Sequence, residues 1–232
     1  MELGIHHEFL LCALNDVHGT WAVKGFRASF ALAGALVAEM QHLERLVSVK
    51  ANTFALRPGP MSTGALGMAE GRLEGRQLNM KKTIAAVATY WFSGVGQIRV
   101  AALDELHREG LVRKEQDTFL FIPWRLRYPE VDGEAEERIR ARLRRHIATV
   151  GDGDAPGRDD LLLSILRASK LLDGIWSEAE IEGLKPAIDE RTRRAPIGVL
   201  IRDLARESEA AAAAAATSYS CAAAFQDLEE AD

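Results

Sequence analysis

The sequence predicts a mainly α-helical protein: a single globular multi-helix domain with a central apolar helix and a few short β-hairpins. Most segments carry apolar residues at the three- and four-residue spacing that gathers them on one face of a helix. Strand-like patterns are confined to short stretches bounded by turn residues. No fixed-period repeat is present. We therefore expect one domain over residues 1–209 and an alanine-rich, acidic low-complexity tail over residues 210–232.

The N-terminal part of the chain is expected to hold two helices and two strand-like stretches. A helix over residues 2–16 places apolar side chains near one stripe and is stopped by an Asn-Asp pair. Residues 21–26 are strand-like but interrupted by a glycine. Helix 27–46 is apolar around much of its girth, which is typical of a central core helix. Residues 46–56 then alternate like a strand up to a Pro-Gly-Pro break.

The middle of the chain predicts three further helices and a hairpin. Two helices, over residues 65–77 and 81–92, precede helix 97–109, which is followed by a well-placed glycine. The inward residues of this last helix are expected to be Ile98, Ala102, Leu103 and Leu106. The next segment predicts a β-hairpin made of Leu111-Val112, a polar turn at residues 114–117 and a strand at residues 118–122.

The C-terminal part of the chain is again helical. A charged helix is expected over residues 134–148, and residues 151–157 form a connector because Gly, Asp and Pro recur there. Amphipathic helices follow at 159–173, 178–193 and 196–209. They need a partner to cover their apolar faces, so one domain is favoured over two.

Composition excludes several classes of protein. The net charge of −5 and the pI of about 5.8 give no global basic field for nucleic acid or anionic lipid. Cys12 and Cys221 are far apart and suit neither a disulfide framework nor a metal site, which favours a reducing cytoplasm. The N-terminus lacks a secretory pattern, and the most apolar window, residues 30–37, is far short of the ~20 residues of a membrane span.

Motifs for catalysis are absent from the sequence. There is no phosphate-binding glycine loop, dinucleotide motif, nucleophile elbow or Cys–His nucleophile arrangement. His6 and His7 are adjacent, hence on different helix faces, and do not form an i, i+4 metal pair. Arg138 and Arg140 each follow a glutamate by four residues, so helical ion pairs absorb part of their charge. We expect no enzyme activity, catalytic residue, cofactor or metal site.

The hairpin contains the most unusual stretch of the sequence. Its residues are apolar without alternation and basic residues follow at once, whereas a strand with one solvated face alternates. One interpretation is a hairpin buried against the helices. The other is an apolar tip that inserts among lipid headgroups, where Trp is favoured and Arg pairs with phosphate. The inserting residues are then Phe119, Leu120, Phe121, Ile122 and Trp124, with Arg125 and Arg127 as flanking basic residues.

Helix 97–109 allows two further interpretations. With its hairpin it resembles the recognition helix and wing of a winged-helix DNA-binding domain, although Asp104 and Glu105 on the face available for a groove repel phosphate. Arg99 lies in the first turn, where a cation opposes the helix dipole. An anion bound to Arg99 and the free amides makes this arrangement favourable. The alternative is a salt bridge from Arg99 to a nearby carboxylate.

Taken in order, several segments are recognisable as a set, and no single motif carries the likeness. They are Phe9-Leu10-Leu11-Cys12-Ala13-Leu14-Asn15-Asp16, Gly19, Leu32-Ala33-Gly34-Ala35-Leu36-Val37-Ala38-Glu39, Thr63-Gly64 with Met68-Ala69-Glu70, Leu103-Asp104-Glu105-Leu106, Glu109-Gly110-Leu111-Val112, Phe119-Leu120-Phe121, and Leu161-Leu162-Leu163 through Ala168 to Leu171-Leu172. The set resembles the Golgi phosphoprotein 3 family (GPP34-type domain) over residues 3–205. The composition looks like that of a bacterial, actinobacterial-like member.

This resemblance implies a compact, mostly helical domain with a few hairpins. Eukaryotic members are peripheral Golgi proteins that recognise phosphatidylinositol 4-phosphate and act as adaptors for glycosyltransferase retention. The resemblance further implies a headgroup pocket built from a tryptophan, an arginine of the second helix and two basic residues near the start of the pre-hairpin helix. An apolar hairpin beside that pocket inserts into the membrane.

The pocket carries over to this sequence only in part. Lys24 occupies the tryptophan position, and Trp21 lies close enough to be equivalent after a small shift. Ala33 replaces the arginine of the second helix. Gly96 replaces the first of the two basic residues, and Arg99 retains the second. The expected headgroup-binding residues are therefore Arg99, Lys24 and Trp21, in a degraded pocket.

The sequence is thus interpreted as a non-enzymatic peripheral membrane or adaptor protein. It is expected to be cytoplasmic, attached to the inner face of the membrane, with an anionic phospholipid headgroup and protein clients as partners. One alternative is an interaction scaffold without lipid binding, whose hairpin and Thr63–Leu73 segment form an oligomer or partner interface. The other is a winged-helix-like DNA-binding protein.

Overall fold

The structure is a computed structural model that describes residues 3–15, 19–23, 25–88, 95–119, 122–149 and 156–229. For residues 95, 118–119, 122–125 and 216–229 it describes the backbone alone. The described residues form ten helices and two antiparallel sheets of two strands each, which confirms the mainly α fold class. The elements are α1 (Ile5–Ala13), α2 (Gly25–His42), β1 (Leu46–Lys50), β2 (Thr53–Leu56), α3 (Gly64–Gly71), α4 (Met80–Ala88), α5 (Val95–Arg108), β3 (Glu115–Phe119), β4 (Ile122–Arg127), α6 (Glu134–Ala148), α7 (Arg158–Ala168), α8 (Leu172–Ile175), α9 (Glu178–Arg194) and α10 (Ile197–Glu229).

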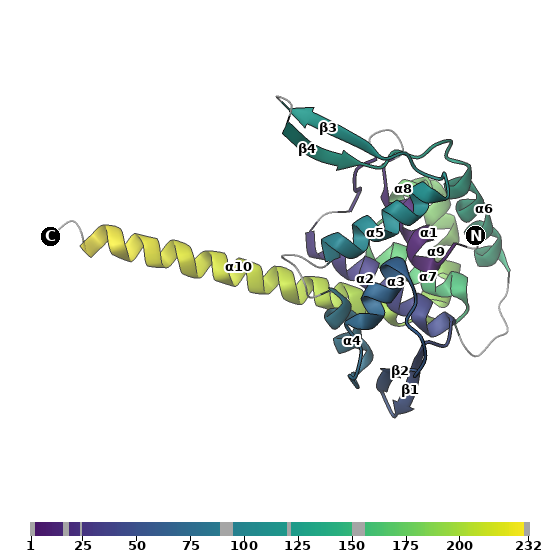
Figure 1. Ribbon diagram of the computed structural model, residues 1–232, viewed down its shortest axis with the longest axis horizontal. Helices are drawn as coiled ribbons and strands as arrows, with labels where there is room; N and C mark the ends of the chain where they lie inside the picture. The colour runs from purple at the N-terminus through teal and green to yellow at the C-terminus, as the bar shows by residue number, and fades with distance from the viewer. Residues whose placement is uncertain are drawn as a thin grey trace.

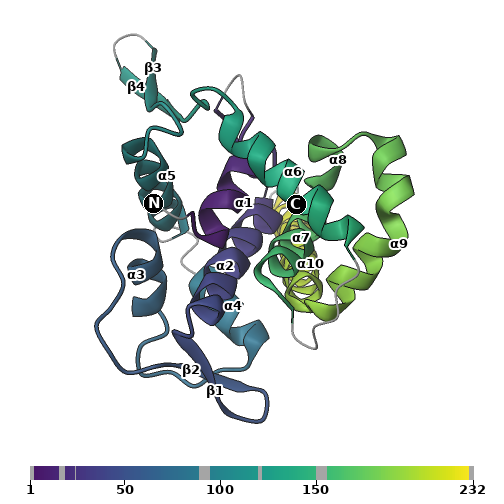
Figure 2. The same ribbon diagram turned by 90° about the vertical axis from the view of Figure 1, so that its right-hand side faces the viewer.

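Helix α2 is the centre of the fold, as its all-round apolar character predicts. Every residue from Phe30 to Met40 is buried, and α1, α4, α7 and α10 all pack against it. Figure 2 shows these helices gathered around α2, with α9 on the outer side of α7. A helix that is apolar on all sides is stable in water only when neighbours cover it completely, so α2 dictates the layering of the domain.

Two strand-like segments fold differently from the prediction. Residues 46–56 form the hairpin β1–β2, because Asn52 adopts a left-handed conformation (φ 56°) and reverses the chain. Residues 21–26 do not form a strand: Trp21 makes an isolated bridge with Leu14, and the last two residues begin α2. Local alternation indicates extended backbone, but it does not say where an extended segment turns.

The register of hairpin β3–β4 also differs from the prediction. Residues 115–117 of the expected turn lie in β3, and the two strands meet at the pair Phe119 and Ile122. Cross-strand ion pairs explain this register, because Arg127 lies 2.7 Å from Asp117 and 3.4 Å from Glu115. The described residues of the apolar stretch, Phe119 and Ile122 among them, therefore lie toward the far end of the hairpin. Figure 1 shows β3 and β4 extending away from the helices.

Helix α10 is longer than predicted. Its first part packs on α2 and α7, but the backbone stays helical past residue 209, through the alanine tract, to Glu229. Alanine has the highest helix propensity, which explains why the low-complexity composition does not end the helix. Figure 1 shows the end of α10 projecting far from the other helices. No helix in the part of the chain that the structure describes combines the length and apolar character needed to cross a membrane.

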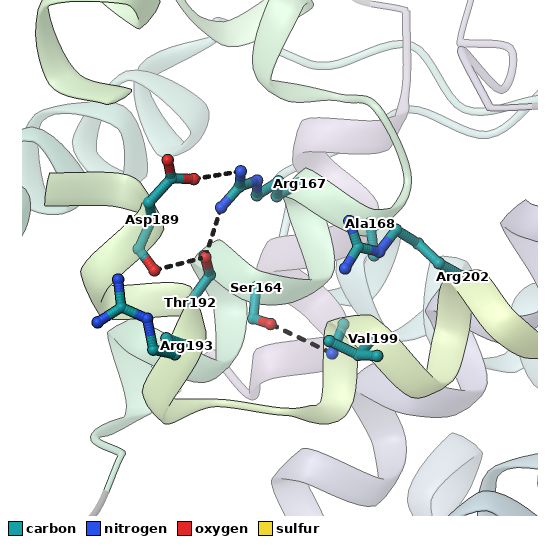
Figure 3. Close-up of a pocket in the computed structure, with 9 residues that line it drawn as sticks. Ser164, Arg167, Ala168, Asp189, Thr192, Arg193, Val199 and Arg202 are labelled. Atoms are coloured by element: carbon teal, nitrogen blue, oxygen red, sulfur yellow. Dashed lines mark hydrogen bonds and ion pairs between the residues drawn. The ribbon is translucent and has the colours of Figure 1, made fainter. Parts of the chain in front are cut away.

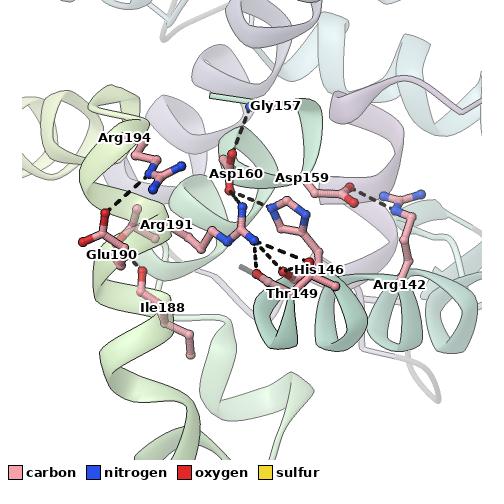
Figure 4. Close-up of polar contacts among 11 residues, drawn as sticks. Arg142, His146, Thr149, Gly157, Asp159, Asp160, Ile188, Glu190, Arg191 and Arg194 are labelled. Atoms are coloured by element: carbon pink, nitrogen blue, oxygen red, sulfur yellow. Dashed lines mark hydrogen bonds and ion pairs between the residues drawn. The ribbon is translucent and has the colours of Figure 1, made fainter. Parts of the chain in front are cut away.

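Buried carboxylates hold the outer helices together. Asp160 of α7 lies 2.7 Å from His146 of α6 and 3.6 Å from Arg191 of α9 (Figure 4). Glu8 of α1, which is also buried, receives Arg142 at 2.6 Å and Arg158 at 2.7 Å. Removing one partner from such a group leaves an uncompensated buried charge, so these contacts fix helix positions even where their net contribution to stability is small.

The charged helix α6 confirms the expected i, i+4 pairs and adds tertiary ones. Arg138 lies 3.6 Å from Glu134, and Arg140 lies 2.6 Å from Glu136. Arg142, in contrast, turns toward α1 and α7 instead of lying on a solvated face. The arginine-rich sequence of α6 is therefore largely neutralised by carboxylates.

The close contact between α10 and α7 predicts opposite effects for two glycine substitutions. A Cβ at Gly198 would lie 2.4 Å from the Ser164 carbonyl oxygen, whereas a Cβ at Gly183 would meet nothing within 4 Å. We expect Gly198→Ala to lower the free energy of unfolding by about 1–3 kcal/mol through overpacking. Gly183→Ala, inside α9, should raise it by about 0.5–1 kcal/mol. Urea unfolding measures both, and equal effects would contradict the packing described.

Candidate functional site

Trp21 packs against Arg99, which lies in the N-terminal half of α5. The Arg99 guanidinium carbon is 5.4 Å from the centroid of the Trp21 ring, within the range of a cation–π interaction. The tryptophan is positioned by its backbone bridge to Leu14 at the end of α1 and by the Phe9 ring, whose centroid is 6.3 Å away. The structure thus brings together two of the three predicted headgroup residues. The third, Lys24, lies outside the described residues.

Among the described residues, no carboxylate neutralises the charge of Arg99. Within the described ranges no acidic side chain lies at ion-pair distance from it, so the alternative of a salt bridge is not observed there. Partial burial beside the Trp21 ring lowers the pKa of Arg99, and Tyr128 opposes this shift slightly. A partly desolvated guanidinium that lacks a counter-charge is a favourable partner for an anion.

The base of the hairpin is held close to this pair. The Tyr128 amide donates to the Gly19 carbonyl oxygen at 3.1 Å. Gly19 has a φ of 57°, and a Cβ there would lie 2.2 Å from the Pro129 nitrogen, so only glycine allows this approach. The segment that leads to Trp21 is therefore packed directly on the end of β4.

Three polar side chains fasten the hairpin to α5. Asp104 accepts hydrogen bonds from the Tyr128 hydroxyl at 2.9 Å and from the Lys114 ammonium at 2.8 Å. Burial would raise the pKa of Asp104, but these two hydrogen bonds outweigh burial and the pKa is lowered. Burial, reinforced by Asp104, raises the pKa of Tyr128. Both Tyr128 and Lys114 directly flank the hairpin, but apolar periodicity does not predict their contacts with Asp104.

Three of the five predicted membrane-inserting residues have a described backbone, and it lies toward the far end of the hairpin. The backbones of Phe119, Ile122, Trp124 and Arg125 belong to β3 and β4. Leu120 and Phe121 lie outside the described residues. The strands pack mainly on each other, and Figures 1 and 2 show them standing off the helical body. The described backbone of the hairpin therefore lies away from the core that α2 organises.

Arg127 and Ala33 are not placed to contact a headgroup. The Arg127 guanidinium is held inside the hairpin by Asp117 and Glu115, at 2.7 and 3.4 Å. Ala33, at the position of the family's second-helix arginine, is buried in the core. The described part of the candidate site therefore consists of Trp21 and Arg99, with Arg127 serving the hairpin itself.

The other face of α5 is turned into the protein. Ile98, Ala102, Leu103 and Leu106 are buried, as predicted. Glu105, which the sequence analysis placed on a face available for a DNA groove, instead accepts a hydrogen bond from the Ala65 amide at 2.9 Å. Helix α5 packs on both α3 and α1.

A separate cavity of about 330 Å³ lies between α7, α9 and α10 (Figure 3). Arg167 on its wall contacts Asp189, and it donates to the Thr192 hydroxyl at 2.6 Å. Neither Trp21 nor Arg99 lines it.

The fold and the site define a mainly α protein with a projecting β-hairpin and an aromatic–cation pair at its base. The sequence model of the family described as Golgi phosphoprotein 3 (GPP34) matches residues 5–218. The chain belongs to the Golgi phosphoprotein 3 family, which confirms the resemblance seen in the sequence. No curated protein matches the chain.

The Tyr128–Asp104 contact predicts a specific dependence of stability on pH. Tyr128→Phe should lower the free energy of unfolding at neutral pH by about 0.5–1.5 kcal/mol, because a buried hydrogen bond is lost. The folded protein raises the pKa of Tyr128 above its ordinary value of 10.0. The unfolded chain therefore ionises first above that pH, and the wild type loses stability that the variant keeps. Denaturant unfolding between pH 7 and 11 should show that the free energies of unfolding of the wild type and Tyr128→Phe become closer as the pH rises. A free-energy difference that stays constant over this range would contradict the contact.

Proposed function

We propose that this protein is a non-enzymatic peripheral membrane protein that binds an anionic lipid headgroup at Trp21 and Arg99 and engages the bilayer through hairpin β3–β4. The observation that carries the proposal is the partly desolvated Arg99, which has an aromatic neighbour but, in the described structure, no carboxylate. A phosphate group would supply the missing counter-charge. Family membership supports a Golgi phosphoprotein 3-like role.

The position of the hairpin supports a joint use of the two features. Its base is hydrogen-bonded to Gly19 and to Asp104 of α5, so it is fixed beside the Trp21–Arg99 pair. Its apolar sequence occupies the opposite, projecting end. A headgroup at Arg99 and acyl chains at the hairpin end could therefore belong to one membrane surface.

The expected contributions to the free energy of membrane binding differ between the charge of Arg99 and the apolar side chains of the hairpin. One arginine near an anionic membrane contributes about 1 kcal/mol. Each large apolar side chain transferred from water contributes roughly 1.5–3 kcal/mol. The hairpin should therefore dominate membrane affinity, and Arg99 should set the preference for acidic lipid.

An interaction scaffold that uses residues 63–73 receives less support. Ala65, Ala69 and Leu73 of this segment are buried, and α3 packs against α5. The segment also contains a large apolar side chain that is exposed, that of Met68. A surface of this kind is too small for a stable apolar interface.

The contribution of the hairpin can be measured by vesicle co-sedimentation. The double variant Phe121→Asp, Trp124→Asp should pellet at least tenfold less with phosphatidylcholine–phosphatidylserine vesicles, because two apolar side chains are lost. The matched control is Leu43→Asp, Val49→Asp, which changes two exposed apolar residues near the β1–β2 end. It should pellet like the wild type. Equal pelleting of the wild type and the hairpin variant would refute the proposal.

The contribution of Arg99 should appear only with acidic lipid. Arg99→Gln should weaken binding to phosphatidylserine-containing vesicles about fivefold and leave binding to pure phosphatidylcholine unchanged. Arg202→Gln, at an exposed arginine of α10, serves as the control and should have no effect. At matched surface charge we expect phosphatidylinositol 4-phosphate to bind no better than phosphatidylserine, since Ala33 is buried and Gly96 is not basic. An equal loss in the Arg99 and Arg202 variants would remove Arg99 from the site.

A further inference from the structure

Three metal-ligating side chains converge between α1 and α5, away from the Trp21–Arg99 pair. His7 Nε2 lies 2.9 Å from Glu105 Oε2, and His6 Nε2 lies 4.0 Å from the same oxygen. The two imidazole rings are 4.0 Å apart between centroids. One ligand atom from each residue lies within 4.8 Å of the others. All three side chains are at most 13% exposed.

His6 is the residue that the fold otherwise leaves unexplained. Both of its ring nitrogens are buried, and neither has a hydrogen-bond partner among the described residues. Leaving a buried polar group without a partner costs about 1–3 kcal/mol, whereas an apolar side chain of similar size would avoid that penalty. An imidazole nitrogen offers a lone pair when it carries no proton, so the unpartnered nitrogens of His6 are suitable metal ligands.

Glu105 is held so that one oxygen faces the histidines. Its Oε1 atom accepts a hydrogen bond from the Ala65 amide, at 2.9 Å, in the first turn of α3. Gly64 makes room for this contact, because a Cβ there would lie 1.5 Å from Oε1. Burial would raise the pKa of Glu105, but hydrogen bonds from His7 and Ala65 lower it more, so the group is an anion. An oriented carboxylate is typical of a supported metal ligand.

We propose that His6, His7 and Glu105 bind a divalent transition-metal ion of the zinc type. Two imidazoles and one carboxylate are a common set of protein ligands for Zn²⁺, and the fourth position is then open to water or another small ligand. Tetrahedral zinc with bonds of 2.0–2.2 Å places its ligand atoms roughly 3.3 Å apart. The two separations to Glu105, 2.9 and 4.0 Å, bracket this value, and the ligand atoms of the two histidines lie within 4.8 Å of each other, so side-chain shifts on the order of 1–1.5 Å complete the site.

Binding would change the hydrogen bonds of His7. The Gly4 amide donates to His7 Nδ1 across a long 3.4 Å contact, which places the ring proton on Nε2 toward Glu105. A metal ion on Nε2 would move the proton to Nδ1, and the contact with Gly4 would open. The ion would replace one long and one short hydrogen bond by three coordinate bonds that join α1 to α5.

Adjacent helix positions point in different directions, so the sequence alone predicts no metal site at His6 and His7. Their rings nevertheless meet, since both histidines occupy the first turn of α1 and Glu105 approaches from another element. The missing signal was the third ligand, which is distant in sequence.

The test uses the full chain after chelator treatment, with Zn²⁺ and Co²⁺ as probes and no lipid present. We expect one Zn²⁺ per chain, a higher Tm with Zn²⁺, and visible Co²⁺ absorption of a four-coordinate site. His6→Phe and Glu105→Gln should each weaken binding at least about tenfold. His42→Gln, at an exposed histidine of α2, should bind like the wild type.

The His6→Phe variant separates a metal site from a structural role. Its Tm without metal should equal or exceed that of the wild type, because it removes two buried nitrogens without partners. Its response to Zn²⁺ should be lost. No binding by the wild type, or equal binding by the wild type and both site variants, would overturn the proposal. If His6→Phe fails to fold, Glu105→Gln decides by the same criterion. Because no membrane is involved, the outcome is independent of the proposed function.

Discussion

Complete burial of α2 is the constraint on which the rest of the structure depends. An eighteen-residue helix that is apolar over most of its surface has to be enclosed, and α1, α4, α7 and α10 together enclose it. Once these helices are placed, their outer faces and the connections between them remain to be fixed. The two hairpins are not needed to enclose α2. Hairpin β1–β2 lies at one end of the molecule and β3–β4 at the other.

Some buried charged or titratable groups are paired with an oppositely charged group of the protein, and others lack such a partner among the described residues. Glu8, Glu70 and Asp160 are each contacted by an arginine distant in sequence, and each ties two or more elements together. Arg99 and His6 differ from them. In the described structure Arg99 has an aromatic neighbour without a carboxylate, and His6 has a carboxylate at 4.0 Å without a hydrogen bond. Most buried polar groups of a folded protein have a partner, so the two exceptions indicate what each group could bind. The guanidinium of Arg99 would be complemented by an anion, and the imidazole of His6 by a Lewis acid.

Periodicity predicted the helices well and the turns poorly. The inward face of α5 and the core position of α2 follow directly from apolar spacing, because burial is what produces that spacing. The register of β3–β4 does not follow from apolar spacing. It depends on which charges meet across the strands, and Arg127 pairs with Asp117 and Glu115. The same limit applies to the sites. Family resemblance identified Trp21 and Arg99, but their contact, and the approach of Glu105 to the histidines, arise from tertiary packing between segments about eighty to one hundred residues apart.

Helix α5 connects the two sites physically. Its side toward α1 carries Glu105, which meets the first turn of α1 and the first turn of α3. One and a half turns earlier it carries Arg99, which meets Trp21, and Trp21 is bridged to Leu14 just after the last turn of α1. The position of Arg99 over the ring therefore depends on how α5 lies along α1, which the Glu105 contacts fix at the other end. A group that strengthens the junction between the histidines and Glu105 would hold α5 in place and would pre-organise Arg99 beside the hairpin. Less ordering of the protein would then be needed when an anion binds, which lowers the free-energy cost of binding.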